Sequence, residues 1–413
     1  MNQLARGTYS DRMKIKKLFL PGLLATLMMS AGARIPWALD IAQAGVSAGT
    51  SVATSTEAEK VFYVATNGND SWSGKLAEPN ASRRDGPFRT LQRVQKAIRA
   101  VKARGALDKP VAVCVRGGEY DLSSPVLFEP ADSGTSQDPI TYAAYPGETP
   151  VISGEKEIAG WERVTHSKLL KQAGGELWIA RVPEVKQGKW YFHELFVNGQ
   201  RRQRARTPNQ DAFLNVDGKV NVGKQGTFKF HPGDIKPEWA AEGNVEVVAL
   251  MRWAEIRMYI RKVDEATHTV TLSGNPTPYH PEISARYWVE NTMDALNAPG
   301  EWYLKRRSGI VYYRPEPGEN IDDIHTIAPA LKQLVRFEGG SGDSRVHDIR
   351  LIGLTFSYAD WSMSPTAYAD IQSAYDIPAA VAGVGTRSIE IQHSRQCSLS
   401  NRGPMLPSSR RGE

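Results

Sequence analysis

The sequence has 413 residues, of which 41% are hydrophobic, so it can bury the core of one large domain or of two. It contains 36 glycines and 25 prolines, which favours many turns and short strands over a helical bundle. The formal net charge of +6 comes from the ends, because residues 1–17 carry +4, residues 394–413 carry +3 and the remainder carries −1. This neutral centre excludes any charge-based argument for nucleic-acid binding.

The N-terminal residues 1–44 are predicted to be a bacterial-type signal peptide. Residues 13–17 (MKIKK) are basic and begin at Met13, an alternative start. Residues 18–33 are apolar but too short and too interrupted for a membrane span, and small residues suited to cleavage follow, the last at 42–44. We therefore expect a secreted or periplasmic protein without a membrane segment in its mature form, with a retained anchor as the alternative.

A linker rich in Ala, Ser, Thr and Gly is predicted at residues 45–60. Its GVSAG at residues 45–49 matches the G-x-S-x-G nucleophile elbow, but it lacks the preceding strand and following helix that an elbow requires. Cys114 and Cys397 are the only cysteines, so the sequence predicts no disulfide and no cysteine-based metal site.

Folded sequence is predicted to begin with a strand at residues 61–66, followed by a turn and a helix. Thr90 is a suitable N-cap and Gly105 a suitable end for that helix. Its apolar residues form one stripe: Leu91, Val94, Ile98 and Val101. This amphipathic helix is expected to cover an apolar surface.

Short strands without intervening helices follow the helix. They lie at residues 111–115, 125–130, 140–146 and 151–154. Such a series forms either an antiparallel sheet or the stacked coils of a solenoid. The first and third of these strands are almost wholly apolar or small, which favours a solenoid whose open end is covered by the helix.

The pattern changes between residues 160 and 323 to longer, aromatic, alternating strands. Asn198-Gly199 and Ser308-Gly309 each separate two strand-like runs, and a further turn is expected near Glu265. This region is predicted to be an inserted antiparallel β-sandwich.

Short strands return after the insert, and residues 348–357 (DIRLIGLTFS) and 387–394 (RSIEIQHS) have the pattern of equivalent strands in successive coils. The predicted organisation places the N-terminal cap and first coils at 61–158, the insert at 159–325 and the returning coils at 326–393.

Five stretches carry a resemblance to a known family. They are YVATNGNDSWSG (63–74), GPFRTLQRVQKAI (86–98), LFVNGQRRQRARTPN (195–209), APGEWYLKRRSGIVYYRPEPGE (298–319) and IRLIGLTFSYADW (349–361). The first two resemble the entry motif of many β-helix carbohydrate enzymes, and the others resemble the insertion domain, and its return to the helix, of proteins related to glycoside hydrolase family 141. The resemblance implies an all-β fold: a right-handed parallel β-helix with an N-terminal capping helix and the inserted sandwich.

The resemblance also implies a function. Relatives of this kind hydrolyse glycosidic bonds of plant-type or other complex polysaccharides, which lie along the outer groove of the coils, and their acidic catalytic residues come from later coils. A polysaccharide lyase and a non-catalytic cell-surface glycan-binding protein are the alternatives. A carbohydrate partner, no nucleic-acid partner and a monomeric state are expected.

The tail, residues 394–413, lacks Val, Ile, Thr, Phe, Tyr and Trp. A β-helix of the resembled family continues for many more coils, so the sequence predicts C-terminal truncation, for example by a frameshift. A native disordered tail is the alternative. Under truncation the catalytic coils are absent and the chain is an inactive fragment.

The candidate site residues come from the returning coils. Asp360 and Glu390 are the carboxylates considered for catalysis, because glycoside hydrolysis uses paired carboxylates. The long loop around residues 357–376 also supplies candidates for sugar binding: Trp361, Tyr368, Gln372 and Tyr375. The alternative for the loop is that Trp361 and Tyr375 pack it against the insert.

The remaining charged groups favour structural roles. The arginines of the first insert hairpin are expected to pair with carboxylates at the domain boundary or to line a solvated strand, rather than clamp an acidic sugar: Arg201, Arg202, Arg204 and Arg206. The histidines, including His193 and His393, lack zinc-binding spacing. No cofactor or metal is predicted, although Ca²⁺ held by loop carboxylates stays open.

Overall fold

The computed structural model describes residues 60–397, apart from 106, 222–224, 276–282, 362, 364–367 and 370–376. The predicted signal peptide, the GVSAG segment and the tail beyond 397 lie outside the described residues. Strands dominate the described part of the chain, which agrees with the all-β prediction.

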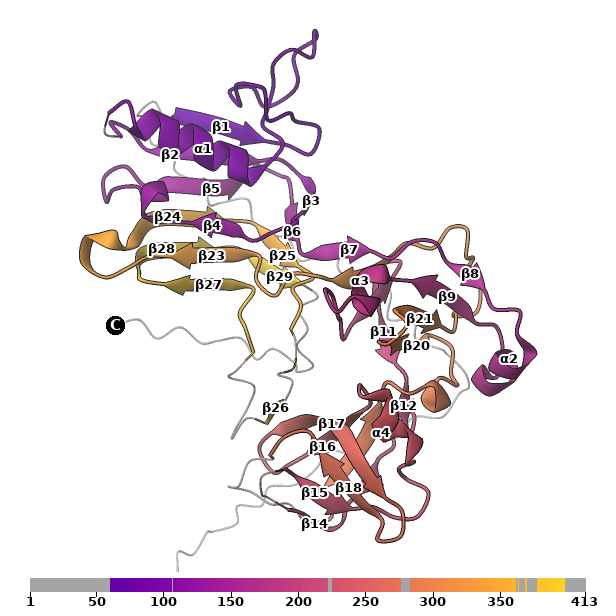
Figure 1. Cartoon of the computed structure of the whole chain (residues 1–413). Coiled ribbons are helices and arrows are strands. Elements are labelled where there is room, and N and C mark those ends of the chain that lie inside the picture. Colours follow the sequence, from indigo (N-terminus) through magenta and orange to yellow (C-terminus); the bar gives the residue numbers. More distant parts are fainter. Residues whose placement is uncertain are drawn as a thin grey trace, which may run out of the picture. The chain divides into compact units, whose positions relative to one another are not determined.

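Five strands with entirely parallel pairing form the first sheet (Figure 1). In spatial order they are β1 (Lys60–Val64), β2 (Val111–Val115), β5 (Ile140–Ala144), β24 (Val346–Ile352) and β28 (Thr386–Gln392). In β2 the residues Val111, Val113 and Val115 are buried and alternate with half-buried ones, because successive side chains of a strand point to opposite faces. The sheet therefore turns one face to the core.

Two further parallel sheets accompany the first. The three-stranded sheet contains β27 (Val381–Val384), β23 (Val335–Glu338) and β4 (Val126–Phe128). The four-stranded sheet contains β29 (Arg395–Cys397), β25 (Thr355–Ser357), β6 (Pro150–Ser153) and β3 (Gly118–Asp121). The chain visits the five-, four- and three-stranded sheets in the same order on each round, from β2 to β6 and again from β23 to β29.

The predicted equivalence of residues 348–357 and 387–394 is confirmed. In β24 and β28, Ile349 lies beside Ile389 and Leu351 beside Ile391. The following strands β25 and β29 are also parallel neighbours. On β27 and β28, Val384 is 73% exposed and Ile391 is 47% exposed.

The predicted amphipathic helix is α1 (Leu91–Lys102). The Thr90 side chain accepts a hydrogen bond from the Arg93 backbone N–H at 3.1 Å, as an N-cap does. Leu91, Val94 and Ile98 are buried in one core with side chains from all three parallel sheets. Within that core, Phe128 and Phe337 stack with ring centroids 4.9 Å apart.

An eight-stranded sheet opens the inserted region. Its spatial order is β7 (Glu155–Glu157), β22 (Thr326–Pro329), β10 (Leu195–Val197), β11 (Gln200–Arg204), β20 (Glu301–Lys305), β21 (Ile310–Tyr313), β9 (Trp178–Arg181) and β8 (Glu162–Arg163). All pairs are antiparallel except β11 with β20. The insert is thus mixed, and not purely antiparallel as predicted. The prediction missed the parallel pair because its two strands are far apart in sequence and hairpin signals mark only neighbouring strands.

A nine-stranded sheet forms the rest of the insert. Its main path is β12 (Arg206–Thr207), β19 (Arg286–Glu290), β16 (Glu246–Leu250), β17 (Glu255–Asp264), β18 (Thr269–Leu272), β15 (Thr227–Lys229) and β14 (Asp217–Asn221). In addition, β13 (Leu214–Asn215) pairs with β19, and β26 (Tyr368–Ala369) pairs with β17. The two sheets of the insert have separate hydrophobic cores.

The turns of the insert match the prediction. Asn198 and Gly199 have φ of 49° and 73°, the left-handed conformation of a two-residue hairpin between β10 and β11. The chain also turns between β17 and β18 and between β20 and β21.

Short helical segments connect several of the strands. They are α2 (Ser167–Ala173), α3 (Pro183–Lys186), α4 (Glu238–Glu242) and the 3₁₀ turns η1 (Pro130–Asp132), η2 (Met293–Ala295) and η3 (Gly342–Ser344). Among the described residues no helix has the length and apolarity needed to cross a membrane.

Candidate functional site

Asp360 lies just after β25 and is 5% exposed. Its backbone N–H donates to the Leu331 carbonyl at 2.7 Å, which fixes its position against the segment that returns from the insert. Its Oδ1 atom is buried and has no hydrogen-bond partner among the described residues. Burial, with a further contribution from the charge of Glu194, raises the pKa of Asp360 to about 8. Asp360 is therefore a protonated acid at neutral pH.

Glu194 is the second carboxylate of this site. It is buried immediately before β10, and its Oε1 atom lies 3.0 Å from a guanidinium nitrogen of Arg201 on β11. The hairpin that places Arg201 beside Glu194 is the one predicted from Asn198-Gly199. A protonated acid and an ion-paired carboxylate thus influence one another electrostatically.

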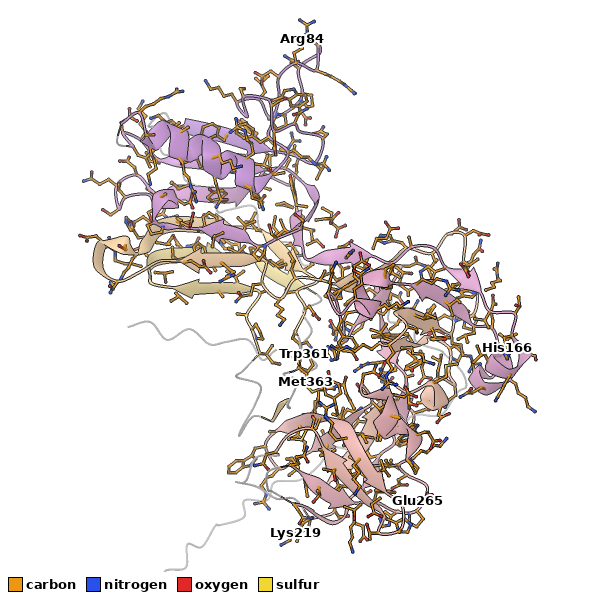
Figure 2. All side chains as sticks on the ribbon, in the orientation of Figure 1. Arg84, His166, Lys219, Glu265, Trp361 and Met363 are labelled. Atoms are coloured by element: carbon orange, nitrogen blue, oxygen red, sulfur yellow. The ribbon has the colours of Figure 1, made fainter. Side chains whose placement is uncertain are left out.

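Trp361 packs inward. It is 8% exposed, and its ring stacks on His193 with centroids 5.0 Å apart and planes 21° apart. It forms a small apolar cluster with Tyr259 and Met363, and Figure 2 shows Trp361 and Met363 close together. These contacts correspond to the structural alternative for Trp361, in which it packs the loop against the insert.

A buried charge network lies next to the His193 ring. Glu246 is fully buried, with Oε1 2.8 Å from Arg204 and 3.4 Å from His193 Nε2. Arg257 lies 3.0 Å from Glu290 and 3.7 Å from Glu246. Although burial opposes ionisation, the neighbouring Arg204 and the other positive partners hold the pKa of Glu246 at about 2.

His193 is the neutral member of this network. Burial lowers its pKa, and the opposing attraction of Glu246 does not reverse that shift. An uncharged imidazole stacked on an indole forms one wall of the site at neutral pH.

A cavity of about 370 Å³ adjoins these groups. Its lining includes the following described residues: Tyr191, His193, Tyr259, Arg261, Arg306, Lys332 and Met363. The charge of Lys332 acts on Asp360, whose pKa it lowers slightly against the larger effect of burial. The cavity and the Asp360 site are therefore linked by Lys332 and by His193, which lines the cavity and stacks on Trp361.

The other predicted site residues lie elsewhere. Glu390 on β28 is half-buried and pairs with Arg350 Nε of β24 at 2.8 Å, and Gln392 also donates to it. Tyr368 belongs to β26 and lies opposite Arg257 in the β17–β26 pair. Gln372 and Tyr375 are outside the described residues.

The expectation for the arginine cluster is confirmed for three of its members. Arg201 pairs with Glu194, Arg202 with Glu319, and Arg204 with Glu246. The fourth member, Arg206, donates to the backbone carbonyls of Pro208 and Ala212 and lies over the Trp288 ring.

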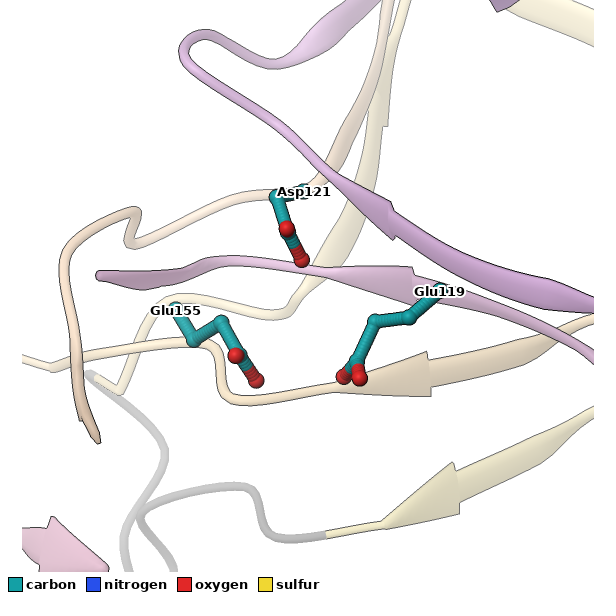
Figure 3. Close-up of side chains that lie close together, drawn as sticks. All are labelled: Glu119, Asp121 and Glu155. Atoms are coloured by element: carbon teal, nitrogen blue, oxygen red, sulfur yellow. The ribbon is translucent and has the colours of Figure 1, made fainter. Parts of the chain in front are cut away.

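A separate acidic cluster joins β3 and β7. The carboxylates of Glu119, Asp121 and Glu155 have oxygens within 4.8 Å of one another and point toward one another in Figure 3. Burial, together with the charge of Glu119, raises the pKa of Glu155 to about 7. Oxygen ligands of this kind suit Ca²⁺, but two of the three residues are exposed, and exposed acidic groups commonly cluster without an ion.

Sequence reasoning did not find Glu194, and it treated His193 as a lone strand residue. Both are strand-like positions next to a hairpin, and only tertiary contacts bring them to Asp360 and Trp361.

Comparison with known proteins gives one family match. Residues 175–316 match the protein-family model described as the GH141 insertion domain. No curated protein matches the sequence.

Two solved structures are similar to the chain. One, titled "Glycoside hydrolase", is 24% identical with a TM-score of 0.59, over 76% of this chain and 53% of the other. A second, titled "The complex structure of XylC with xylose", is 15% identical with a TM-score of 0.37, over 82% of this chain and 42% of the other. The chain spans about half the length of the first, with which it shares a fold.

Proposed function

We propose that the protein, in its full-length form, is an exported glycoside hydrolase that cleaves a complex polysaccharide of plant or similar origin. The match of residues 175–316 to the GH141 insertion domain carries this proposal. The shared fold with a solved glycoside hydrolase supports it. Export rests on the signal-peptide pattern of residues 1–44.

The proposed architecture is a right-handed parallel β-helix interrupted by the insertion domain. Its support is the regular order in which the chain visits three parallel sheets. In such a solenoid each coil contributes one strand to each sheet, and the coils share one continuous core. The core that joins α1 to all three sheets fits this arrangement.

Within the described residues, Asp360 is the proposed general acid. Hydrolysis of a glycosidic bond needs a proton for the leaving oxygen and a second carboxylate as base or nucleophile. Asp360 is protonated at neutral pH because it is buried, and Glu194, held by Arg201, is the nearby ionised carboxylate. The family resemblance implies acidic catalytic residues on later coils, which is an alternative to Asp360. The experiment below therefore tests Asp360 directly.

The test compares the 413-residue chain, the full-length gene product and its Asp360→Asn variant on a panel of cell-wall polysaccharides, with release of reducing ends as the readout. The full-length product is expected to hydrolyse one member of the panel, and Asp360→Asn to lower kcat by roughly a hundredfold or more. Asp343→Asn, an exposed change in η3, is the matched control. Full activity of Asp360→Asn would remove Asp360 from catalysis.

The rival functions give different products. A polysaccharide lyase leaves an unsaturated sugar that absorbs in the ultraviolet, whereas a hydrolase does not. Binding without release of any product would assign the protein to glycan recognition instead.

A further inference from the structure

The cavity beside the Trp361–His193 wall is strongly positive. Three cationic side chains line it, Arg261 from β17, Arg306 from the β20–β21 turn and Lys332 from the segment that follows β22. Among the described lining residues there is no Asp or Glu. Three distant segments of the chain therefore converge to place positive charge around one cavity.

Two of these cations lie over aromatic rings. The guanidinium carbon of Arg306 lies 4.8 Å from the centre of the Tyr191 ring, and that of Arg261 lies 5.7 Å from the centre of the Tyr259 ring. Cation–π contacts of this kind favour one placement of an arginine side chain beside the ring. The rings also give the cavity an apolar surface.

The nearest buried carboxylates do not cancel this charge. Glu246 is already paired with Arg204, and Arg204 also donates to the Tyr191 hydroxyl at 2.8 Å. Within the described residues, neither Arg306 nor Lys332 forms an ion pair. Within the described residues, Arg306 and Lys332 therefore have no paired counter-charge, and an anion in the cavity could supply one.

We propose that this cavity binds a sugar unit that carries an anionic group, either the carboxylate of a uronic acid or a sulfate ester. The inference rests on the proposed carbohydrate function and specifies its substrate class as acidic. Arginine and lysine donate charge-assisted hydrogen bonds to such oxyanions, and tyrosine rings pack against the apolar face of a sugar ring. The volume of about 370 Å³ is within the range of small ligand sites.

A neutral sugar fits this cavity less well. It would displace water from Arg306 and Lys332 without supplying a charge in return, and removing water from an uncompensated ion is costly. When the ligand carries an oxyanion, its direct pairing with Arg306 and Lys332 offsets the cost of removing water from these two side chains.

The test measures binding of the full chain by calorimetry to a short oligogalacturonate and to its fully methyl-esterified form. The two probes have the same rings and linkages, but only the first is charged. The charged probe is expected to bind roughly tenfold or more tightly, and the difference should shrink in high salt. A sulfated galactan oligosaccharide is the third probe, and preference for it over oligogalacturonate would identify the anion as a sulfate ester.

Arg306→Gln tests the assignment to this cavity. It is expected to weaken binding of the preferred charged probe roughly tenfold and to leave binding of the neutral ester unchanged. Arg307→Gln is the control, because Arg307 is exposed like Arg306 but is absent from the cavity lining. Equal loss in both variants would overturn the assignment.

The two proposals fail in different ways. Equal affinity for charged and neutral probes, with hydrolysis of a neutral polysaccharide, would overturn the acidic specificity alone. Tight binding of a charged probe, together with failure of the full-length gene product to cleave any glycan, would overturn the hydrolase function and leave the cavity assignment standing. Binding of no probe would overturn the cavity assignment.

Discussion

The protonation of Asp360 follows from its surroundings. The carboxyl is buried, one of its oxygens lacks a hydrogen-bond partner among the described residues, and Glu194 lies near enough to disfavour a second negative charge. An unfolded chain offers none of these constraints, so the same side chain ionises there near pH 4. The folded state therefore retains a proton that the unfolded state releases over several pH units.

This difference predicts a pH-dependent stability. Between about pH 4 and pH 8 the unfolded chain binds fewer protons at Asp360, so the free energy of unfolding falls as pH rises. Asp360→Asn cannot ionise and should remove this slope, which is at most about 1.4 kcal/mol per pH unit. Urea unfolding of both proteins at a series of pH values measures the difference.

The expected result is a variant that gains stability over the wild type progressively toward pH 8. Asp343→Asn serves as the reference, because its exposed carboxylate has no such burial. A constant difference between wild type and Asp360→Asn at all pH values would show that Asp360 is ionised in the folded protein.

Sequence and structure agree unevenly at the level of residues. Asp360 and Trp361 were visible in the sequence because they begin a long interruption of the strand rhythm. Glu194 was not, since its role depends on Asp360, which is remote in sequence. Trp361 carried two interpretations, and only the position of His193 shows which surface its ring covers.

Aromatic side chains stack between neighbouring strands and between the parallel sheets. Phe128 of β4 stacks on Phe337 of β23 and meets Tyr142 of β5 edge-on at 5.2 Å. Its ring thus contacts residues of two of the three sheets. Tyr142 precedes the insert in the sequence, and Phe337 follows it. Loss of that ring would open a cavity at the centre of the core.

Phe128→Ala is expected to lower the free energy of unfolding by about 3–5 kcal/mol. Leu76→Ala, at a position 40% exposed, should cost less than about 1 kcal/mol. Chemical denaturation followed by circular dichroism measures both. Similar small losses in the two variants would indicate that the three sheets do not share a cooperative core.

At the scale of elements, prediction succeeded wherever a local pattern was decisive. The helix cap at Thr90 and the Asn198-Gly199 hairpin follow from nearby residues, and the pairing of β24 with β28 follows from the matching patterns of the two strands. The parallel pair β11–β20 was missed because nothing local marks it. The strand β3 was missed because its sequence, GEYD, is polar and contains glycine, which disfavours a strand assignment.

For the whole molecule, the strands β27 and β28 lie at the ends of two parallel sheets within the described residues. The apolar Val384 on β27 and Ile391 on β28 are accessible to solvent. Strands with unpaired backbone groups and exposed apolar side chains tend to associate with other chains. The sequence-based expectation of further coils remains a prediction, which translation of the downstream DNA in all three frames will test.

Ile391→Lys is expected to reduce concentration-dependent association of the 413-residue chain, because a charge on an edge strand opposes pairing. Light scattering over a concentration series measures the effect. Leu76→Lys, another exposed apolar position, is the control. If both variants associate to the same extent, the association does not depend on the outer strands.

The interruption between β6 and β23 has a consequence for how the chain folds during synthesis. β6 pairs with β25, and β5 with β24, across the whole of residues 154–334. The cost of closing a flexible loop grows with its length, but β7 and β22 already pair at the base of the insert. An insert that folds first brings the two ends together and turns a long-range closure into a short one. If the insert folds first, β5 and β6 have to wait for it before they can pair with β24 and β25, and the folding rate of the insert then sets how long their edges stay unpaired.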